Sequence, residues 1–337
     1  MVDHQTSTPY DCVIVGGGPT GLFGAFYAGL RGMRTLLVES LDRLGGQPAI
    51  LYPEKWIYDV PGFVKIRGGE LVQRLIEQGG STGAEFRTGC TVQKVERLDD
   101  LYHLDLSDGS SVATRGILIA TGIGAFRPRR HPLAALDDFT GRGVMYGIKN
   151  LADLRDRRVV VVGGGDAAVD WALTAMEVTD DVAVVHRRNA FRAMEESVER
   201  LRRSPAKILT PCEITGCRGN DRLEAVDVKD LETGDITTVP CDEVIVCIGY
   251  HSDLGPVNDW GLLIEDGKIQ VGPTMATNLE RVYAAGDVVS YPGKIELIAV
   301  GFTEAAIAIN HLKHDLEPEA SVQPARSSST GVKMAAN

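Results

Sequence analysis

Two glycine-rich segments constrain what this chain can fold into more than any other feature of its sequence. The first, GGGPTG at residues 16–21, follows the apolar run VIV at 13–15, and the second, GGGDAA at 163–168, follows VVVV at 159–162. Runs of β-branched residues predict buried parallel strands, and a strand that turns through glycines directly into a helix is typical of dinucleotide-binding units. The pattern predicts an α/β protein with two Rossmann-like, three-layer (ββα/βαβ) dinucleotide-binding domains.

The first segment and the strand after it indicate which nucleotide this half prefers. Gly16 permits the tight turn, Gly18 lets the backbone approach a pyrophosphate, and Gly21 allows the helix to pack closely on the strand. Glu39 follows the apolar run TLLV at 35–38. A carboxylate at that strand end can accept hydrogen bonds from both ribose hydroxyls and would repel a 2′-phosphate. The first half therefore favours FAD or NAD over NADP.

The second half carries the opposite charge at the equivalent strand end. Its second strand, VAVV at 182–185, is followed by His186, Arg187 and Arg188, with Arg192 shortly after. Guanidinium groups bind phosphate through charge-assisted hydrogen bonds that contribute roughly 1.5–3 kcal/mol each. Two of them would favour NADPH over NADH by on the order of a hundredfold. The alternative, an exposed basic turn without a ligand, remains open.

The order of the segments predicts that one domain is inserted into the other. Near the C-terminal end, VYAAGD at 282–287 reads as a strand that ends in Gly-Asp, and an apolar helix is expected from about Leu297 to Leu312. This pattern looks like the return of the first domain. We therefore expect an FAD-binding domain at 1–148 and 279–337, with an NADPH-binding domain at 149–278. The two connections, near Tyr146 and Thr277, would form a hinge.

Composition excludes several classes of function. A formal net charge of −11 argues against nucleic acid as a ligand, and no apolar run is long enough to span a bilayer, so we expect a cytoplasmic protein. The six cysteines are too sparse for a disulfide framework, and no metal site is predicted. Three basic segments, at 127–130, 155–158 and 200–203, are either solvated surface or docking surfaces for an acidic partner.

Several motifs together resemble the low-molecular-mass thioredoxin reductases, which are flavoproteins with two dinucleotide-binding domains. The resemblance rests on GGGPTG, Glu39, GGQ at 45–47, ATG at 120–122, HRR at 186–188 and AGD at 285–287. The chain departs from that family at its redox pair, because VMYGIKN at 144–150 stands where a Cys-x-x-Cys is expected. No cysteine occurs between Cys90 and Cys212, and the Cys212/Cys217 pair lies late in the inserted domain. Dithiol chemistry is therefore not expected.

The remaining motifs resemble the thioredoxin-reductase-like (type 2) ferredoxin-NADP reductases. GGQPAILYPEK at 45–55, IYDVPG at 57–62 and VQP at 322–324 carry this resemblance. It implies that Gln47 hydrogen-bonds the isoalloxazine ring, that Tyr52 stacks on it and that Asp287 meets the ribityl chain. It also implies a homodimer whose C-terminal extension covers the flavin, with Arg326 where relatives carry a ring and Ser328 within hydrogen-bonding reach of the flavin.

The site predicted from the motifs and from the resemblance has two parts and includes no conventional catalytic side chain. Backbone near Val92 and Phe126 is included because the resemblance implies that it helps to seat FAD. The residues predicted to bind FAD are Gly16, Gly18, Pro19, Thr20, Gly21, Glu39, Gly46, Gln47, Tyr52, Val92, Ala120, Thr121, Gly122, Phe126, Gly286, Asp287 and Ser328. Those predicted to bind NADPH are Gly163, Gly165, Asp166, Ala167, His186, Arg187, Arg188 and Arg192.

The resemblance implies a reversible ferredoxin-NADP reductase activity. Hydride would pass from NADPH to the flavin, and single electrons would then pass to ferredoxin or flavodoxin in a transient complex. The main alternative is an NADPH-dependent reductase of a disulfide, a quinone or another small molecule, without a redox dithiol of its own. Relatives that reduce small thiol disulfides carry a cysteine where Thr20 stands, which counts against that substrate. A flavin redox sensor is the non-enzyme alternative, and the intact second half disfavours it.

Overall fold

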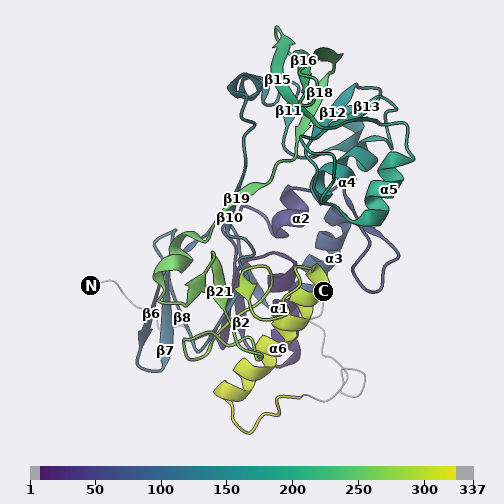
Figure 1. Cartoon of the computed structure of the whole chain (residues 1–337). Coiled ribbons are helices and arrows are strands. Elements are labelled where there is room, and N and C mark those ends of the chain that lie inside the picture. The colour runs from purple at the N-terminus through teal and green to yellow at the C-terminus, as the bar shows by residue number, and fades with distance from the viewer. Residues whose placement is uncertain (1–7, 324–337) are drawn as a thin grey trace. The chain divides into compact units, whose positions relative to one another are not determined.

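The computed structural model describes residues 8–323, apart from the side chains of residues 126, 127 and 252. The chain forms two compact units. Unit 1 comprises Met1–Ala49, Ile57–Phe126 and Ser252–Asn337, and unit 2 comprises Ile50–Trp56 and Arg127–His251. Each unit contains a five-stranded parallel sheet, so the predicted α/β class with two dinucleotide-binding domains is confirmed (Figure 1).

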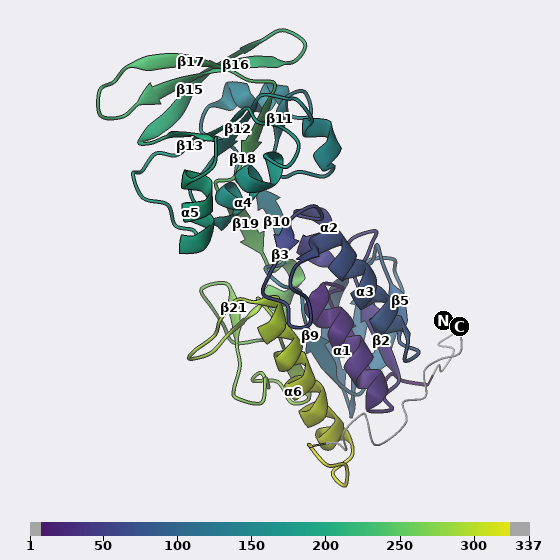
Figure 2. The same cartoon turned by 90° about the vertical axis from the view of Figure 1, so that its right-hand side faces the viewer.

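The sheet of unit 1 lies between a layer of helices and a layer of antiparallel strands. Its strand order is β22-β9-β1-β2-β5, and helix α1 packs between α3 and α6 (Figure 2). The sheet strands are β1 (Cys12–Val15), β2 (Thr35–Val38), β5 (Glu85–Arg87), β9 (Ile117–Ile119) and β22 (Val282–Ala284). The helices are α1 (Pro19–Leu30), α3 (Gly68–Gly80) and α6 (Ile298–Leu316), and the antiparallel layer is β6 (Val92–Leu98), β7 (Leu101–Leu106) and β8 (Ser111–Thr114).

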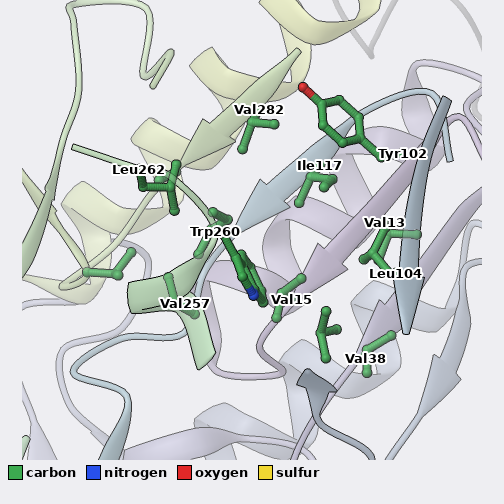
Figure 3. Packing of buried hydrophobic residues seen from close by; sticks show 14 of the residues in the cluster. Val13, Val15, Val38, Tyr102, Leu104, Ile117, Val257, Trp260, Leu262 and Val282 are labelled. Atoms are coloured by element: carbon green, nitrogen blue, oxygen red, sulfur yellow. The ribbon is translucent and has the colours of Figure 1, made fainter. Parts of the chain in front are cut away.

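Both faces of this sheet are buried, which explains why its strands are continuous apolar runs. Val13 and Val15 point into a core shared with Tyr102 and Leu104 of the antiparallel layer and with Trp260 of a later segment (Figure 3). On the opposite face, a Cβ atom at Gly24 of α1 would lie only 2.8 Å from the Leu118 side chain. Such close packing of the helix on the sheet fixes the start of α1 at the carboxyl edge of the strands, where ligands bind in folds of this kind.

Unit 2 repeats the three-layer arrangement around a second parallel sheet, of order β11-β18-β12-β13-β14. Its strands are β11 (Val144–Met145), β12 (Val159–Val162), β13 (Val182–Val185), β14 (Lys207–Leu209) and β18 (Glu243–Val246). One face packs on α4 (Asp166–Ala175) and α5 (Glu195–Arg202), and the other packs on three antiparallel strands. These are β15 (Cys212–Gly219), β16 (Leu223–Asp230) and β17 (Ile236–Pro240).

Short elements complete both units. In unit 1, β20 (Ile264–Glu265), β21 (Lys268–Gln270) and β23 (Val289–Ser290) form a small sheet near η3 (Gly255–Asp259). The others are α2 (Gly46–Ile50), β3 (Trp56–Ile57) with β4 (Ile66–Arg67), β10 (Ala125–Pro128) with β19 (Tyr250–Asp253), η1 (Ala134–Phe139) and η2 (Leu151–Leu154). None of the helices in residues 8–323 combines the length and apolar character that a membrane span requires.

The boundaries of the inserted unit differ from those expected at 149 and 278. Residues 127–148 belong to unit 2 because β11 pairs with β18 in its sheet. Residues 252–278 belong to unit 1 because β21 pairs with β23 there. The first pairing joins residues 100 positions apart, such as Val144 and Val244, so local sequence patterns carry no signal for it.

A further difference concerns the segment Ile50–Trp56, which was expected to belong to the first domain and instead belongs to unit 2. The Lys55 ammonium lies 2.5 Å from an Asp170 carboxylate oxygen on α4. The Trp56 indole N–H donates a hydrogen bond to Glu177, and Tyr52 packs against the core of this unit. The chain therefore passes between the two units four times rather than twice.

Candidate nucleotide-binding sites

The first glycine segment forms the turn between β1 and α1 at the carboxyl edge of the sheet in unit 1. Gly16 has φ +110°, a conformation that side-chain-bearing residues rarely adopt. A Cβ at this position would overlap the Ala120 carbonyl oxygen, and one at Gly21 would overlap the Gly16 carbonyl oxygen. Pro19 is the first residue of α1, where its missing N–H costs no hydrogen bond. The turn and the helix start are therefore shaped as predicted.

Gly18 faces free space, in contrast to Gly16 and Gly21. Gly18 precedes α1 in an extended conformation, and a Cβ there would lie 4.0 Å from its nearest neighbour, the Gly46 Cα atom. The loop that leads into α2 is held beside it, because the Gly45 amide donates a 2.8 Å hydrogen bond to the Gly17 carbonyl. The N-terminus of α1 and the open space over Gly18 together form a cradle, and helix N-termini of this kind bind phosphate groups.

Glu39 lies at the end of β2, and only 6 % of its surface is exposed. Its carboxylate accepts hydrogen bonds from the Gly17 amide at 2.6 Å and from the Leu41 amide at 2.8 Å. The same side chain also lies close to where a Cβ of Gly17 would be, at 3.1 Å. Glu39 is therefore fixed against the glycine turn, at the strand end where the sequence places a ribose ligand.

The ATG turn that follows β9 contributes a polar atom without a partner. The Thr121 hydroxyl is buried and makes no hydrogen bond to any residue of the described part of the chain. The side-chain amide of Gln47 lies over the same turn, 3.6 Å from where a Cβ of Gly122 would be. Because a buried hydroxyl is nearly always satisfied, Thr121 indicates that a polar ligand group completes this site.

The Gly286-Asp287 turn is held in place by a buried charge network that the sequence did not reveal. The Gly286 amide donates a 2.7 Å hydrogen bond to Glu304 of α6, whose other oxygen accepts from Tyr291 and pairs with Lys294 at 2.6 Å. The side chains of Glu304 and Lys294 are almost fully buried. Glu304 is the only acidic residue in the apolar run 298–312, and that isolated charge is the signal that marks it.

Asp287 itself is half-buried and carries no hydrogen bond or ion pair within residues 8–323. Burial raises the pKa of its carboxyl group, and the charges of Glu296 and Glu304 act in the same direction. A carboxyl group with a raised pKa and no partner in the protein is a candidate ligand-binding group. Its position after β22, next to β9 in the sheet, brings it to the same edge as the glycine turn.

The arrangement in unit 1 fits the groups of FAD, because an open pyrophosphate cradle, an orphaned buried hydroxyl and an unpaired carboxyl group lie at one sheet edge. The structure brings together Gly16, Gly18, Pro19, Thr20, Gly21, Glu39, Gly46, Gln47, Ala120, Thr121, Gly122, Gly286 and Asp287. Val92 begins β6, two residues after Cys90, whose amide donates to the Glu39 carbonyl. Tyr52 belongs to unit 2, Phe126 ends unit 1, and Ser328 lies outside the described residues.

In unit 2 the second glycine segment forms the same kind of turn between β12 and α4. Gly163 has φ +144°, and a Cβ there would overlap the Cys247 carbonyl oxygen at the end of β18. Gly165 precedes α4 in an extended conformation, with no atom closer than 3.9 Å to where its Cβ would be. Asp166 and Ala167 follow as the first two exposed residues of the helix. An open helix N-terminus is thus presented here as well.

The arginine segment predicted to bind the 2′-phosphate lies beside this turn. Arg187, Arg188 and Arg192 are exposed, and none makes a side-chain hydrogen bond or ion pair within the described ranges. His186 is different, because its ring stacks on Phe191 and covers Gly164, and its Nε2 atom is 3.2 Å from the Ala190 carbonyl. Burial lowers the pKa of His186, the hydrogen bond to Ala190 opposes this shift, and the charges of the three arginines lower the pKa further.

The cysteines offer no dithiol in either unit. All six are free thiols, and Cys212 and Cys217 both lie on the antiparallel strand β15. Burial raises the pKa of both thiols, and it raises the pKa of Cys247, at the end of β18, to about 12. Reactive cysteines need a depressed pKa, so none of these three thiols is poised for redox exchange.

Two sheets that each carry an open glycine turn at the carboxyl edge define a protein with two dinucleotide-binding domains. The family model for pyridine nucleotide-disulphide oxidoreductases matches residues 10–305. The chain is 43 % identical over 322 residues to ferredoxin--NADP reductase 2 of Oceanobacillus iheyensis, covering 95 % of this chain and 98 % of the relative. It is 42 % identical over 322 residues to the ferredoxin--NADP reductase of Thermus thermophilus, covering 94 % and 96 %.

A solved structure of the same architecture is thioredoxin reductase of Lactococcus lactis, with a TM-score of 0.78 and 28 % identity, covering 91 % of this chain and 99 % of that one. The chain belongs to the pyridine nucleotide-disulphide oxidoreductase family and, within it, to the thioredoxin-reductase-like (type 2) ferredoxin-NADP reductases. It is accordingly an enzyme of that group, and the resemblance predicted from the motifs is confirmed.

Proposed function

We propose that this enzyme takes hydride from NADPH and passes electrons one at a time to ferredoxin or flavodoxin. One observation carries the proposal. The site in unit 1 has the polar groups of a flavin site, while the chain has no cysteine between Cys90 and Cys212 to pass electrons to a disulfide substrate. The curated relatives at 42–43 % identity are ferredoxin-NADP reductases, which supports the same acceptor class.

FAD is the cofactor that best suits unit 1. Gly18 and the N-terminus of α1 would hold its pyrophosphate, Glu39 its ribose hydroxyls, and Asp287 the ribityl chain. Gln47 and Thr121 would donate to and accept from the ring system, which satisfies the orphaned hydroxyl. When bound, the flavin supplies both hydride acceptance and single-electron release, so the protein needs no general base of its own.

NADPH is the nucleotide that best suits unit 2. The Gly163–Ala168 turn would bind its pyrophosphate, and the free guanidinium groups of Arg187, Arg188 and Arg192 would bind its 2′-phosphate. The double substitution R187A/R188A is expected to raise KM for NADPH by about a hundredfold and KM for NADH by less than threefold. Equal increases for both nucleotides would show that these arginines do not bind the 2′-phosphate.

The acceptor is tested by following NADPH oxidation coupled to cytochrome c reduction, with and without added ferredoxin or flavodoxin. A large stimulation by either carrier protein supports the proposal. Activity that appears only with disulfides or quinones would assign the enzyme to a different reaction of the same flavin. All six thiols are free, and the pKa values of Cys212, Cys217 and Cys247 are raised, so treating the folded enzyme with a thiol-alkylating reagent should leave ferredoxin reduction unaffected.

A homodimer is the proposed assembly, and the outer face of α1 and α6 in unit 1 supports it. Phe23 packs against Phe302 at a ring distance of 5.1 Å and against Phe26 and Tyr27 at 6.0 Å. All four rings remain partly exposed, and α1 is apolar on nearly every side. A helix of that composition needs cover on both faces, which a second copy would provide. Sedimentation equilibrium would test this, because a purely monomeric protein at micromolar concentration contradicts it.

A further inference from the structure

Two hydrogen bonds join the arginine segment of unit 2 to the glycine turn, and neither bond involves an arginine side chain. The Arg192 amide donates a 2.6 Å hydrogen bond to the Gly164 carbonyl. The Met194 amide donates a 2.9 Å hydrogen bond to the Oδ1 atom of Asp166, the first residue of α4. Residues 186–194, which we call the arginine loop, are thus fixed against the turn at their C-terminal end.

The other end of the arginine loop is fixed by His186. Its ring lies against Gly164, where a Cβ would overlap three ring atoms, and its Nε2 donates to the Ala190 carbonyl. With both ends fixed, the guanidinium groups of Arg187 and Arg188 remain exposed and unpaired between them. Exposed side chains on an immobilised backbone lose less entropy on binding than side chains on a mobile loop.

Asp166 is badly placed to bind the nucleotide itself. A carboxylate beside the helix N-terminus repels the phosphates that this end of α4 would attract. Its Oδ1 atom is instead used by the Met194 amide, and Met194 is the residue that precedes α5. The carboxylate therefore joins the start of α4 to the start of α5, across the loop that carries the arginines.

We propose that Asp166 is a positioning residue that sets the preference for NADPH over NADH by holding the arginine loop, without touching the nucleotide. This inference rests on the proposed NADPH site of unit 2 and changes the role first expected for Asp166. The bound 2′-phosphate would meet guanidinium groups whose backbone is already ordered. NADH lacks that phosphate, so the ordered backbone of the arginine loop would not increase its affinity.

The test compares D166A and D166N in the full-length protein. Binding of adenosine 2′,5′-bisphosphate and of 5′-AMP is measured by calorimetry, and KM for NADPH and NADH is measured from flavin reduction. D166A is expected to weaken the bisphosphate and raise KM for NADPH about five- to tenfold, with less than twofold change for 5′-AMP and NADH. D166N retains an acceptor oxygen for Met194 and should restore most of the preference.

A second variant tests the same hydrogen bond from the donor side. Met194 has φ −54°, which proline can adopt, so M194P removes the N–H without imposing a new backbone angle at that residue. M194P should lose the preference for NADPH to the same extent as D166A. The double variant D166A/M194P should lose no more of it than either single variant. E196A is the matched control, because it removes an exposed negative charge from α5 and leaves the Asp166–Met194 bond intact.

Two results would overturn the inference. If D166A weakens 5′-AMP and NADH as much as the 2′-phosphorylated ligands, Asp166 supports the pyrophosphate turn rather than the arginine loop. If M194P leaves the preference unchanged, the hydrogen bond has no role in it. Neither the binding measurement nor the KM measurement requires ferredoxin. Both can therefore be interpreted even if ferredoxin is not the electron acceptor. A parent protein that discriminates against NADPH would refute the nucleotide assignment itself.

Discussion

Gly18 and Gly21 lie three positions apart in one motif, and the structure explains the two glycines in different ways. A Cβ at Gly21 would overlap the Gly16 carbonyl oxygen, whereas a Cβ at Gly18 would meet no protein atom closer than 4.0 Å. The backbone of Gly18 has φ −73°, which alanine adopts without strain. Gly21 is therefore required by the fold, and Gly18 is required by whatever occupies the space over the helix N-terminus.

The two alanine substitutions should separate stability from cofactor binding. G21A is expected to lower the free energy of unfolding of the flavin-free protein by about 2 kcal/mol or more, because rigid backbone must move. G18A should change it by less than about 0.5 kcal/mol, yet weaken FAD binding at least about tenfold. Thermal unfolding of the flavin-free proteins and flavin retained after dialysis measure the two effects. Full flavin retention by G18A would contradict the assignment of this cradle.

Charged residues were the least predictable part of the site. Glu39 and the arginines could be located from sequence because they follow a recognisable strand at a fixed place in the motif. The isolated charge of Glu304 is visible in the sequence, but its role is not, because its partners Gly286 and Lys294 come from a separate loop and only the fold brings them together. The role of Asp166 was also hidden, since its hydrogen bond reaches Met194, 28 residues away. The motif predicts where a ligand binds, but it does not predict which residues hold the binding groups in place.

At the level of strands and helices, local pattern was a reliable guide. The runs at 13–15, 35–38, 159–162 and 182–185 all became central parallel strands, because burial on both faces demands continuous apolar sequence. The expected helix from about 297 to 312 is observed as Ile298–Leu316. Local pattern does not predict which side chains link the N-terminal ends of neighbouring strands.

One such joint is the pairing of Arg158 and Asp242, at the amino ends of β12 and β18. The Arg158 guanidinium donates to both oxygens of Asp242, at 3.1 and 2.7 Å, and the Arg158 amide donates to the same carboxylate at 2.9 Å. These hydrogen bonds lower the pKa of Asp242 from its ordinary 3.8 to about 2. Because the folded state favours the charged form, the resulting stability is fully present above pH 4 and is lost as pH falls towards 2.

D242N should therefore destabilise unit 2 in a pH-dependent way. At pH 7 we expect a loss of about 1 kcal/mol, a value reduced for the partial exposure of the pair. The difference in the free energy of unfolding between parent and variant should become smaller below pH 4, because the Asp242 carboxylate of the parent becomes protonated. Thermal unfolding at pH 7, 5, 4 and 3 measures this. The control is D235N, which removes a charge from a turn of the same unit without breaking an ion pair. If the difference in unfolding free energy between parent and D242N increases in acid, the Arg158–Asp242 pair is not the source of this stability.

At the scale of the whole molecule, the sequence predicts that one domain interrupts the other, and the compact units of the structure end at residues other than the predicted boundaries. The β11–β18 and β21–β23 pairings decide where each unit ends, and they join residues 100 and 20 positions apart, respectively. The segment Ile50–Trp56 is the clearest case, because it lies directly after the GGQ motif of unit 1 and yet packs within unit 2. No motif distinguishes it from its neighbours in the chain.

The Lys55–Asp170 ion pair should hold that segment in place. Both side chains are about three-quarters buried, so the pair is better shielded from solvent than most surface pairs. D170N is expected to increase the rate of tryptic cleavage after Lys55 about threefold, because cleavage follows the population in which the segment is detached. D180N, which neutralises an exposed acid near the end of α4, is the matched control. An unchanged cleavage rate in D170N would show that Tyr52 and Trp56 hold the segment without the ion pair.

The placement of Ile50–Trp56 has a consequence for how genes of this group can recombine. A crossover that exchanged only codons 127–251 between two relatives would set a foreign α4 against the resident Tyr52, Lys55 and Trp56. The exchange keeps its native contacts only if codons 50–56 travel with it, as a second and separate block. The heritable module that carries the proposed NADPH site is therefore discontinuous in the gene, although it is compact in the protein.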